Sequence, residues 1–255
     1  MLTEQRYEEI LKLLEQKNTI TVQELKDALN ASESTIRRDL NSLHDLGKLI
    51  KVFGGAVGLE SALHTRDVEV SNRKNVNSDE KMSIAKYAAR LIQGDDFVYL
   101  DAGTTTGYII DFLTEKQAVF VTNGVDHAQK LASMGYKVFL VGGELKASTQ
   151  AIVGSGAVMD IQKYHFTKGF WGANGIEIKA GLTTPDPDEA MIKRISMKQT
   201  KRKYILGDHD KFGLISPVTF GDIESTYIIT DKIEQPAYRK YKNIIISQEV
   251  GSDKG

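Results

Sequence analysis

SESTIRRDLNSLHDLGKLIKVFGG, residues 32–55, is the stretch of sequence that decides the fold of the N-terminal part of the chain. Its apolar residues recur at helical spacing between residues 36 and 46, and Ser32 is a residue type that caps the start of a helix. Gly47 ends the helical pattern, and residues 48–53 have the character of a short strand that stops at a glycine pair. The stretch therefore predicts a helix followed by a short hairpin.

Two further helical patterns precede this stretch. Residues 2–14 carry an apolar stripe at helical spacing, which predicts a first helix. Thr21-Val-Gln-Glu24 reads as a capping box, in which the threonine hydroxyl and the glutamate carboxylate each satisfy a free backbone N–H at the start of a short second helix. Asn30 breaks the pattern before the third helix. Helix, helix, tight turn, helix and short hairpin is the order of a winged helix-turn-helix, a mainly α fold.

The third helix carries the case for DNA binding. A major groove admits one helix, whose N-terminal residues meet base edges while nearby cations meet phosphates. Residues 36–51 contain four basic and two acidic residues, a positive island in a chain of net charge −1. We expect DNA contacts from the exposed first turns of the helix and from the lysines of the wing: Ser32, Ser34, Thr35, Arg37, Arg38, Lys48 and Lys51. The plainer interpretation is a three-helix interaction module, which would show no salt-sensitive DNA binding.

The composition excludes several kinds of functional site and of sequence segment. The chain has 255 residues, 33 Lys+Arg against 34 Asp+Glu, and 41% hydrophobic residues, as expected for a folded globular protein. It has no cysteine, which excludes disulfides, thiolate metal sites and thiol catalysis. The start, MLTEQRYEEI, lacks the apolar core of a signal peptide, and no apolar run approaches the ~20 residues that span a bilayer. We therefore expect a cytoplasmic protein without a membrane segment.

After residue 57 the pattern changes. Residues 58–79 are polar and irregular and predict a linker between a DNA-binding domain at 1–57 and a second domain at 80–250. In the second domain helical patterns at 80–93, 105–113, 125–134 and 187–200 alternate with short apolar strands, which predicts an α/β fold with a largely parallel, doubly wound sheet. The expected strands are Phe97–Leu100, Ala118–Thr122, Lys137–Val141, Lys168–Trp171, Lys203–Leu206, Tyr227–Thr230 and Asn243–Ile246.

The first of these strands ends in Asp101-Ala-Gly-Thr-Thr-Thr106, directly before a helix. A glycine followed by threonines at a helix start offers N–H groups, hydroxyls and the positive end of the helix dipole, which together suit a phosphate. The plainer interpretation is an ordinary capped helix after a glycine turn. The loop lacks the Gly-x-x-x-x-Gly-Lys-Ser/Thr pattern of a nucleotide-binding P-loop, so that class of site is excluded.

Polar residues also follow the other strands. In an open parallel sheet the carboxyl ends of the strands meet at one edge, where ligands bind. Carboxylates and amides would accept or donate hydrogen bonds to hydroxyls, and the cations would hold a phosphate, so a small phosphorylated polyol is the expected ligand. The candidate residues are Asp101, Gly103, Thr104, Thr105, Thr106, Asn123, Gly143, Asn174, Glu189 and Lys211.

Other motifs are weaker. Gly154-Ser-Gly156 lacks the third glycine of a dinucleotide fingerprint. The five histidines are scattered without metal-ligand spacing, so we expect no metal and no cofactor. Trp171 could pack in the core or serve as a stacking platform, and core packing is the expected role.

A series of motifs runs in order along nearly the whole chain: Arg6…Ile10…Leu14, Ser32-x-x-Thr35-Ile-Arg-Arg-Asp-Leu40, Gly54-Gly55-Ala56, Lys81 with Ile84-Ala85, Asp101-x-Gly-Thr-Thr-Thr106, Thr122-Asn123, Gly142-Gly143, Gly172-Ala-x-Gly175, Gly181-Leu-Thr-Thr184, Glu189-Ala190 and Asp208-x-x-Lys211-Phe. In this series the chain resembles the DeoR family of bacterial transcriptional repressors. The resemblance implies a winged helix-turn-helix joined to an α/β sugar-phosphate sensor domain that is similar to ribose-5-phosphate isomerase.

The same resemblance implies a function. Such proteins repress operons for sugar or polyol uptake and catabolism and are released from operator DNA by a phosphorylated intermediate. The pattern is similar to that of fructose-operon repressors, so fructose 1-phosphate is the first expected effector, with tagatose 6-phosphate and glycerol 3-phosphate next. Because helix-turn-helix proteins bind dyad sites, we expect a homo-oligomer, either a dimer or a tetramer.

The isomerase likeness leaves an enzyme as the alternative. Glu189 matches the position of the isomerase base in outline, whereas the Asp-Gly-Ala-Asp turn of the isomerases is replaced by Trp171-Gly-Ala-Asn174. Both carboxylates are absent, and proton transfer between sugar carbons needs such groups. A pocket of this kind is expected to bind without turnover, with no catalytic residue. A second departure is Asp210, which stands where the family's Asp-x-Ser-Lys motif has a serine.

Overall fold

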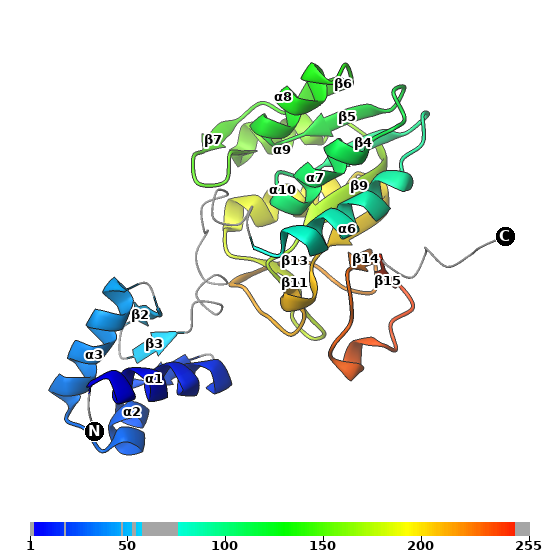
Figure 1. The fold of residues 1–255 in the computed structure, drawn as a ribbon. Helices are drawn as coiled ribbons and strands as arrows, with labels where there is room; N and C mark the ends of the chain where they lie inside the picture. Colours follow the sequence, from blue (N-terminus) through cyan, green and yellow to red (C-terminus); the bar gives the residue numbers. More distant parts are fainter. Residues whose placement is uncertain (1–2, 18, 47, 53–54, 58–75, 248–255) are drawn as a thin grey trace. The chain divides into compact units, whose positions relative to one another are not determined.

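Two units, residues 1–66 and 67–255, make up the chain in the computed structural model. The structure describes residues 3–17, 19–46, 48–52, 55–57 and 76–247 (Figure 1). Most of the expected linker lies outside the described residues, and its last two residues, 78 and 79, belong to the first helix of the second unit. Each unit has its own buried apolar core.

The N-terminal unit is a winged helix-turn-helix, as the sequence predicts. Its helices are α1 (Thr3–Lys17), α2 (Val22–Leu29) and α3 (Glu33–Asp45). The wing is an antiparallel sheet in the order β1-β3-β2, formed by Thr19–Thr21, Gly55–Val57 and Ile50–Val52. The pattern predicted the β2–β3 hairpin but missed β1, a strand too short to show a period of its own.

The local signals act as expected. The Thr21 hydroxyl accepts a hydrogen bond from the Glu24 N–H while the Glu24 carboxylate accepts one from the Thr21 N–H, so the capping box is complete. Asn30 ends α2 in the left-handed conformation at φ 48°. Gly55 is required by a close approach, because a Cβ there would lie 2.2 Å from the Ile20 carbonyl oxygen on β1. These features fix the turn between α2 and α3 and the close pairing of β3 with β1.

The capping box predicts that the stability of α2 depends on pH in the acid range. Hydrogen bonds from the Thr21 backbone and hydroxyl, and then Lys17, lower the pKa of Glu24 from 4.5 to about 2. A carboxylate whose pKa is depressed in the folded state stabilises that state above its unfolded pKa, and this contribution is lost as pH falls through the folded pKa. We expect α2 to lose helicity between about pH 4.5 and pH 2 and expect Glu24→Gln to remove that part of the transition in circular dichroism. An unchanged acid profile in Glu24→Gln would contradict the assignment.

The C-terminal unit is built on a parallel sheet of seven strands in the order β15-β14-β12-β9-β4-β5-β6. All seven expected strands are in it, with ends that differ by a few residues: β4 (Phe97–Leu100), β5 (Val119–Thr122), β6 (Lys137–Leu140), β9 (Phe166–Gly172), β12 (Thr200–Leu206), β14 (Tyr227–Thr230) and β15 (Ile244–Ile246). The expected α/β class and the parallel sheet are therefore confirmed.

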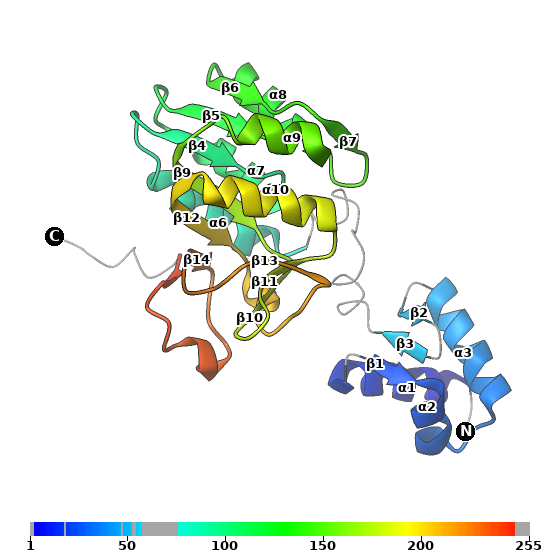
Figure 2. The same cartoon turned by 180° about the vertical axis from the view of Figure 1, so that it is seen from behind.

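Helices cover both faces of this sheet. One face carries α6 (Ser78–Arg90), α7 (Thr104–Ile109) and α8 (Val125–Ser133), as Figure 1 shows. The other face carries α9 (Gly154–Ile161) and α10 (Pro187–Lys198), which lie in front in Figure 2. Each pair of layers encloses an apolar cluster, one around Ile84 and Phe170 and the other around Trp171 and Ile192. The sheet is thus the middle layer of three, and its carboxyl edge is free to carry loops.

Shorter elements were not predicted. A hairpin of β7 (Glu144–Lys146) and β8 (Ala151–Val153) follows β6, and a small antiparallel sheet contains β10 (Gly175–Glu177), β11 (Gly181–Thr184) and β13 (Val218–Gly221). Most of these strands lack the continuous apolar run that marks the strands of the parallel sheet. Among the described residues no helix is both long and apolar enough to cross a membrane.

Candidate functional site

The N-terminal half of α3 presents polar side chains outward. Ile36 and Leu40 are buried, so the intervening Arg37 and Arg38 point away from the core, and Ser34 is also exposed. Thr35 is half-buried. This arrangement leaves an exposed polar strip at the start of the second helix of a helix-turn-helix, the part that enters a major groove.

Four of the expected DNA contacts already make interactions within α3 and its cap: Ser32, Ser34, Thr35 and Arg37. The Ser32 hydroxyl accepts a hydrogen bond from the Thr35 N–H at 3.2 Å, which caps α3, so Ser32 serves first to start the helix. Arg37 donates to Glu33 one turn earlier, with Nε–Oε1 at 2.9 Å, and both side chains are about half exposed. An exposed pair of this kind is weak and leaves Arg37 available to another anion. In the wing, Lys48 is exposed and Lys51 lies in β2.

A buried ion pair sets the orientation of α3. Arg6 on α1 donates from Nε to Asp39 Oδ2 at 2.7 Å and from its Nη2 to Oδ1 at 3.0 Å. The Asp39 side chain is 3% exposed and that of Arg6 is 13% exposed. Because both carboxylate oxygens are held, α3 cannot turn about its axis without breaking the pair. Sequence reasoning placed Arg6 in the family signature but did not pair it with Asp39, 33 residues away.

Removing one partner of this pair is expected to lower the stability of the N-terminal unit. Asp39→Ala removes the carboxylate that two nitrogens of the Arg6 guanidinium contact, so the bidentate link between α1 and α3 is lost. We expect a lower melting temperature for this unit, measured by circular dichroism on the full chain. Lys12→Ala is the matched control, since Lys12 and Glu9 form an exposed pair at 3.8 Å whose loss should change little. Equal melting temperatures for the two variants would contradict the role given to Asp39.

The carboxyl ends of four strands in the C-terminal unit lie level with one another. Leu100 of β4 is in register with Thr122 of β5 and with Phe170 of β9, and Gly172 of β9 is in register with Leu206 of β12. The loops that follow therefore start at one edge of the sheet. They carry the expected site residues Asp101, Gly103, Asn123, Asn174 and Lys211.

Thr104 and Thr105 are the residues of this edge whose hydroxyls are available to a ligand. They open α7 after Gly103, whose extended backbone makes it the N-cap, and α7 has no side-chain cap. Neither threonine hydroxyl makes a hydrogen bond with a described residue, and the same holds for the ammonium group of Lys211 in the turn after β12. These are the expected site residues that could meet an anion without breaking an internal contact.

Thr106 and Asn123, which are expected to contact a ligand, already make hydrogen bonds within the protein. The Thr106 hydroxyl donates to the carbonyl oxygens of Asp101 and Gly103, at 2.7 and 2.8 Å. Asn123 Oδ1 accepts from the Tyr99 hydroxyl and from the Ala102 N–H, and its amide donates to the Ile152 carbonyl. Both side chains are at most 2% exposed. They hold the loop in shape and have little left to offer a ligand.

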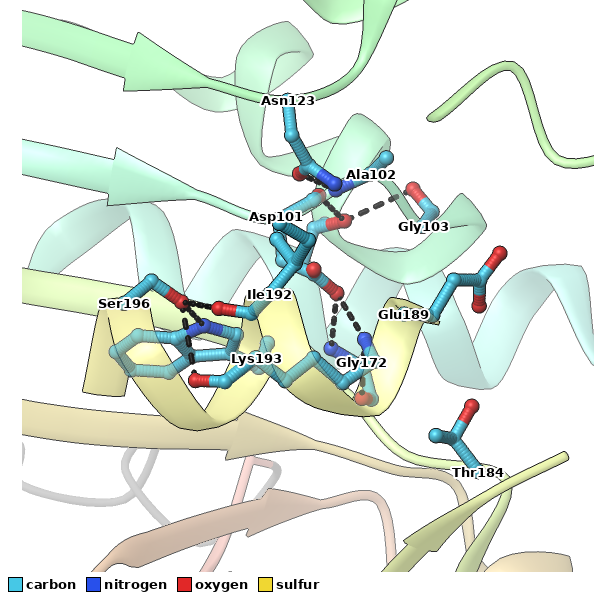
Figure 3. A network of polar contacts seen from close by, with 12 residues as sticks. Asp101, Ala102, Gly103, Asn123, Gly172, Thr184, Glu189, Ile192, Lys193 and Ser196 are labelled. Atoms are coloured by element: carbon cyan, nitrogen blue, oxygen red, sulfur yellow. Dashed lines mark hydrogen bonds and ion pairs between the residues drawn. The ribbon is translucent and has the colours of Figure 1, made fainter. Parts of the chain in front are cut away.

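Asp101 is likewise an internal support. Its carboxylate is bonded to the Lys193 ammonium of α10 and to the Gly172 N–H, and Lys193 also donates to the Gly172 carbonyl at 3.1 Å (Figure 3). Burial raises the pKa of Asp101, and the nearby Lys193 opposes this rise. The pair joins the ends of β4 and β9 to α10. The Asp101 carboxylate is thus already engaged by Lys193 and by the Gly172 N–H, and its expected contact with a ligand hydroxyl stays a prediction.

Glu189 and Asn174 keep partial freedom. Glu189 accepts from Lys146 of the β7–β8 hairpin at 3.4 Å, and Lys146 also reaches Asp186 at 2.8 Å. Asn174 Oδ1 accepts from the Thr184 hydroxyl at 3.2 Å, and its amide group makes no hydrogen bond with a described residue. Figure 3 shows Glu189 and Thr184 without a contact to the Asp101–Lys193 pair. Sequence reasoning missed Lys146 because it lies 43 residues from Glu189 along the chain.

Gly143 is a packing position. It has φ 144°, and a Cβ there would lie 2.6 Å from the Val153 carbonyl oxygen of β8. Only glycine permits this approach of the β6–β7 turn to β8. The expected contact of Gly143 with a ligand has no support from this packing.

Trp171 is a core residue, as expected. Its side chain is fully buried, its Nε1 donates to the Ser196 hydroxyl at 2.9 Å, and its ring stacks on Tyr99. In the part of the chain that the structure describes, no group of three His, Asp or Glu residues could hold a metal ion.

Comparison with known proteins assigns a separate family domain to each of the two units of the chain. The DeoR-like helix-turn-helix domain matches residues 6–62, and the DeoR C terminal sensor domain matches residues 76–232. The chain is 42% identical to the uncharacterized HTH-type transcriptional regulator FruR of Bacillus subtilis, over 95% of this chain and 96% of that one. It is 32% identical to the HTH-type transcriptional regulator IolR of Bacillus subtilis, over 93% and 95%, and 30% identical to a lactose phosphotransferase system repressor of Staphylococcus aureus, over 94% and 97%.

Solved structures with local likeness include a ribose 5-phosphate isomerase A from Methanocaldococcus jannaschii. It is 16% identical, with a TM-score of 0.39, over 53% of this chain and 55% of that one. A D-ribose-5-phosphate isomerase in complex with phospho-erythronic acid is 18% identical, with a TM-score of 0.41, over 53% and 54%.

Proposed function

Since the chain belongs to the DeoR family of helix-turn-helix transcriptional regulators and is not an enzyme, we propose that it represses an operon for sugar uptake or catabolism and leaves its operator when a sugar phosphate binds the C-terminal unit. The observation that carries the proposal is the uncommitted pair of hydroxyls on Thr104 and Thr105, in a chain that also exposes the start of α3. One unit offers groups for DNA and the other offers groups for an anion.

The DNA-binding part of the proposal rests on α3. Ser34, Arg37 and Arg38 are exposed and would face the bases, with Thr35 beside them. Ser32 positions them by capping the helix, and Lys48 and Lys51 would contact phosphates. Operators read by such helices are dyads, so a homo-oligomer, dimer or tetramer, is part of the proposal.

The effector part rests on the sheet edge. Thr104, Thr105 and Lys211 would hold the phosphate, because hydroxyls and an ammonium group are its natural donors. Asn174 and Glu189 would read hydroxyls, while Asp101, Thr106 and Asn123 shape the loop. Fructose 1-phosphate is the proposed effector, since the relatives include a regulator named FruR and a phosphotransferase-system repressor. Tagatose 6-phosphate and glycerol 3-phosphate are next.

Release from DNA has an energetic requirement. The effector shifts the equilibrium only by its preference for the state that binds DNA weakly. A hundredfold preference amounts to ~2.7 kcal/mol, enough to vacate an operator of modest affinity.

The test is fluorescence anisotropy with DNA from upstream of the chain's own operon, at two salt concentrations, with each of the three sugar phosphates. The expected result is tight binding that weakens with salt and is lost with one of the phosphates. Absence of DNA binding at both salt concentrations would contradict the repressor, and DNA binding that none of the three changes would contradict the proposed effectors. No observation favours isomerase activity: by the resemblance Trp171 stands where the isomerases carry a carboxylate, and its side chain is buried in the core.

A further inference from the structure

Asp210 joins two segments of the C-terminal unit that lie far apart in the sequence. It stands where the family's Asp-x-Ser-Lys motif has a serine, and it belongs to η2 (His209–Lys211), the turn after β12. Its carboxylate accepts a hydrogen bond from the side-chain amide of Asn77, with Nδ2 and Oδ2 2.6 Å apart. The contact spans 133 residues of sequence and connects this turn to the start of α6.

The side chain of Asn77 serves this contact rather than its own helix. Asn77 is the N-cap of α6, a position at which an asparagine side chain usually accepts a hydrogen bond from the first turn. Here it makes no capping bond to the described first turn. Its backbone is left-handed at φ 51°, a conformation that asparagine adopts more readily than most residues. The start of α6 is therefore held by Asp210 instead of by a local cap.

The residue before Asn77 is fixed to α6 as well. Lys81 is 5% exposed, and its ammonium group donates to the Val76 carbonyl at 2.6 Å. The chain that precedes Val76 leads to the N-terminal unit, which ends at residue 66. Val76 and Asn77 are thus the first described residues of the C-terminal unit on the path from the DNA-binding helices, and both are held by side chains of that unit.

The turn that carries Asp210 is fixed to the sheet edge. The His209 N–H donates to Asp231 Oδ1 at 2.9 Å, directly after β14, and His209 Nδ1 lies 2.8 Å from the other oxygen of that carboxylate. His209 Nε2 lies 3.3 Å from Asp210 Oδ1. The residue after Asp210 is Lys211, whose ammonium group is a donor of the sheet-edge site. Because the two residues are adjacent in a turn of three, a displacement of Lys211 also displaces Asp210.

We propose that the hydrogen bond between Asp210 and Asn77 couples the sheet-edge site to the DNA-binding unit. A phosphate held by Lys211 shifts the turn, and Asp210 passes the shift to the start of α6, where the chain from the DNA-binding unit arrives. Asp210 is a positioning residue and touches neither the effector nor DNA. The inference rests on the proposed function, because it requires that an anion at Lys211 releases the operator.

The test determines a coupling factor for the full chain, the ratio of operator affinity without effector to operator affinity with effector. Fluorescence anisotropy gives the two operator affinities, and isothermal titration calorimetry gives the affinity for fructose 1-phosphate, tagatose 6-phosphate and glycerol 3-phosphate. Asn77→Ala and Asp210→Ser each break the contact. We expect both variants to bind effector and free operator as the unsubstituted chain does, while the coupling factor falls roughly tenfold.

A reciprocal exchange tests the contact itself. Asn77→Asp alone places two carboxylates against each other, so this variant should also lose coupling. Combined with Asp210→Asn, it restores an amide facing a carboxylate with donor and acceptor exchanged, and the coupling factor should return.

Glu234→Ser is the matched control for the loss of charge. Glu234 is an exposed carboxylate near Asp210, but it pairs with Lys232, two residues away, and has no hydrogen bond to α6 among the described residues. Its loss should leave the coupling factor unchanged. An equal fall in Glu234→Ser would show that surface charge, and not the contact, is responsible.

The outcomes separate this inference from the proposed function. If none of the three sugar phosphates changes operator binding by the unsubstituted chain, both fail. If one of them does, and Asn77→Ala and Asp210→Ser keep the full coupling factor or the exchange does not restore it, the coupling role of Asp210 alone is overturned. Loss of effector binding in Asp210→Ser would also overturn it, because Asp210 would then belong to the binding site.

Discussion

Replacing Arg37 and Arg38 together by alanine is expected to lower the affinity for operator DNA by at least about thirtyfold. Each side chain is exposed on the first turns of α3, and a good contact from arginine to a base is worth about 1–3 kcal/mol. Fluorescence anisotropy on the operator and on a scrambled duplex of equal length measures the effect.

The scrambled duplex separates two roles. If the arginines read bases, the double variant loses operator affinity and its binding to the scrambled duplex falls less. If they contact only phosphates, both duplexes lose affinity alike and the salt slope falls by about one for each lost contact. Unchanged operator affinity would contradict the assignment of α3 altogether.

Two matched variants test whether charge alone explains such a loss. Lys12→Ala removes one positive charge from the exposed face of α1 and should change binding little. Glu33→Ala releases Arg37 from its intrahelical pair and should not weaken binding, because the guanidinium is then free for DNA. Weaker binding in Glu33→Ala would mean that the pair itself orients Arg37.

Thr105→Val is expected to make the repressor insensitive to its effector. The variant keeps the shape of the side chain and removes a hydroxyl that makes no hydrogen bond with a described residue, so the fold should not suffer. A hydrogen bond to a charged phosphate is worth about 1.5–3 kcal/mol, which corresponds to a ten- to hundredfold weaker effector. The measurement is the concentration of sugar phosphate that releases half of the bound operator, with operator affinity itself unchanged.

The neighbouring threonine is the control for this experiment. The Thr106 hydroxyl donates to two backbone carbonyls, so Thr106→Val should lower the melting temperature of the C-terminal unit. Its effect on the effector should arise only through that loss of stability. Normal effector release in Thr105→Val would show that the phosphate is held elsewhere, and the sheet-edge assignment would then fail.

The predictions for α3 and for α7 differ in how far the sequence alone supports them. The α3 assignment follows from local signals, because a cap at Ser32, an apolar stripe and a terminal glycine all act within a few residues of one another. The α7 assignment also begins locally, since glycine and threonines at a strand end identify the loop. The sequence does not show which of the three adjacent threonine hydroxyls makes an internal hydrogen bond. Only the folded loop brings the carbonyl oxygens of Asp101 and Gly103 within reach of Thr106.

The sequence by itself determined the winged helix-turn-helix, the seven strands of the parallel sheet and the edge of the sheet at which the candidate residues lie. Periodicity, caps and turn residues are properties of neighbours in the chain, and they survive without any tertiary contact. The tertiary structure alone decided that Lys193 holds Asp101 across 92 residues and that Arg6 holds Asp39 across 33. It also decided that Asp210 accepts a hydrogen bond from Asn77 across 133 residues. These facts depend on which side chains meet at a distance, and several arrangements of partners satisfy the same local pattern.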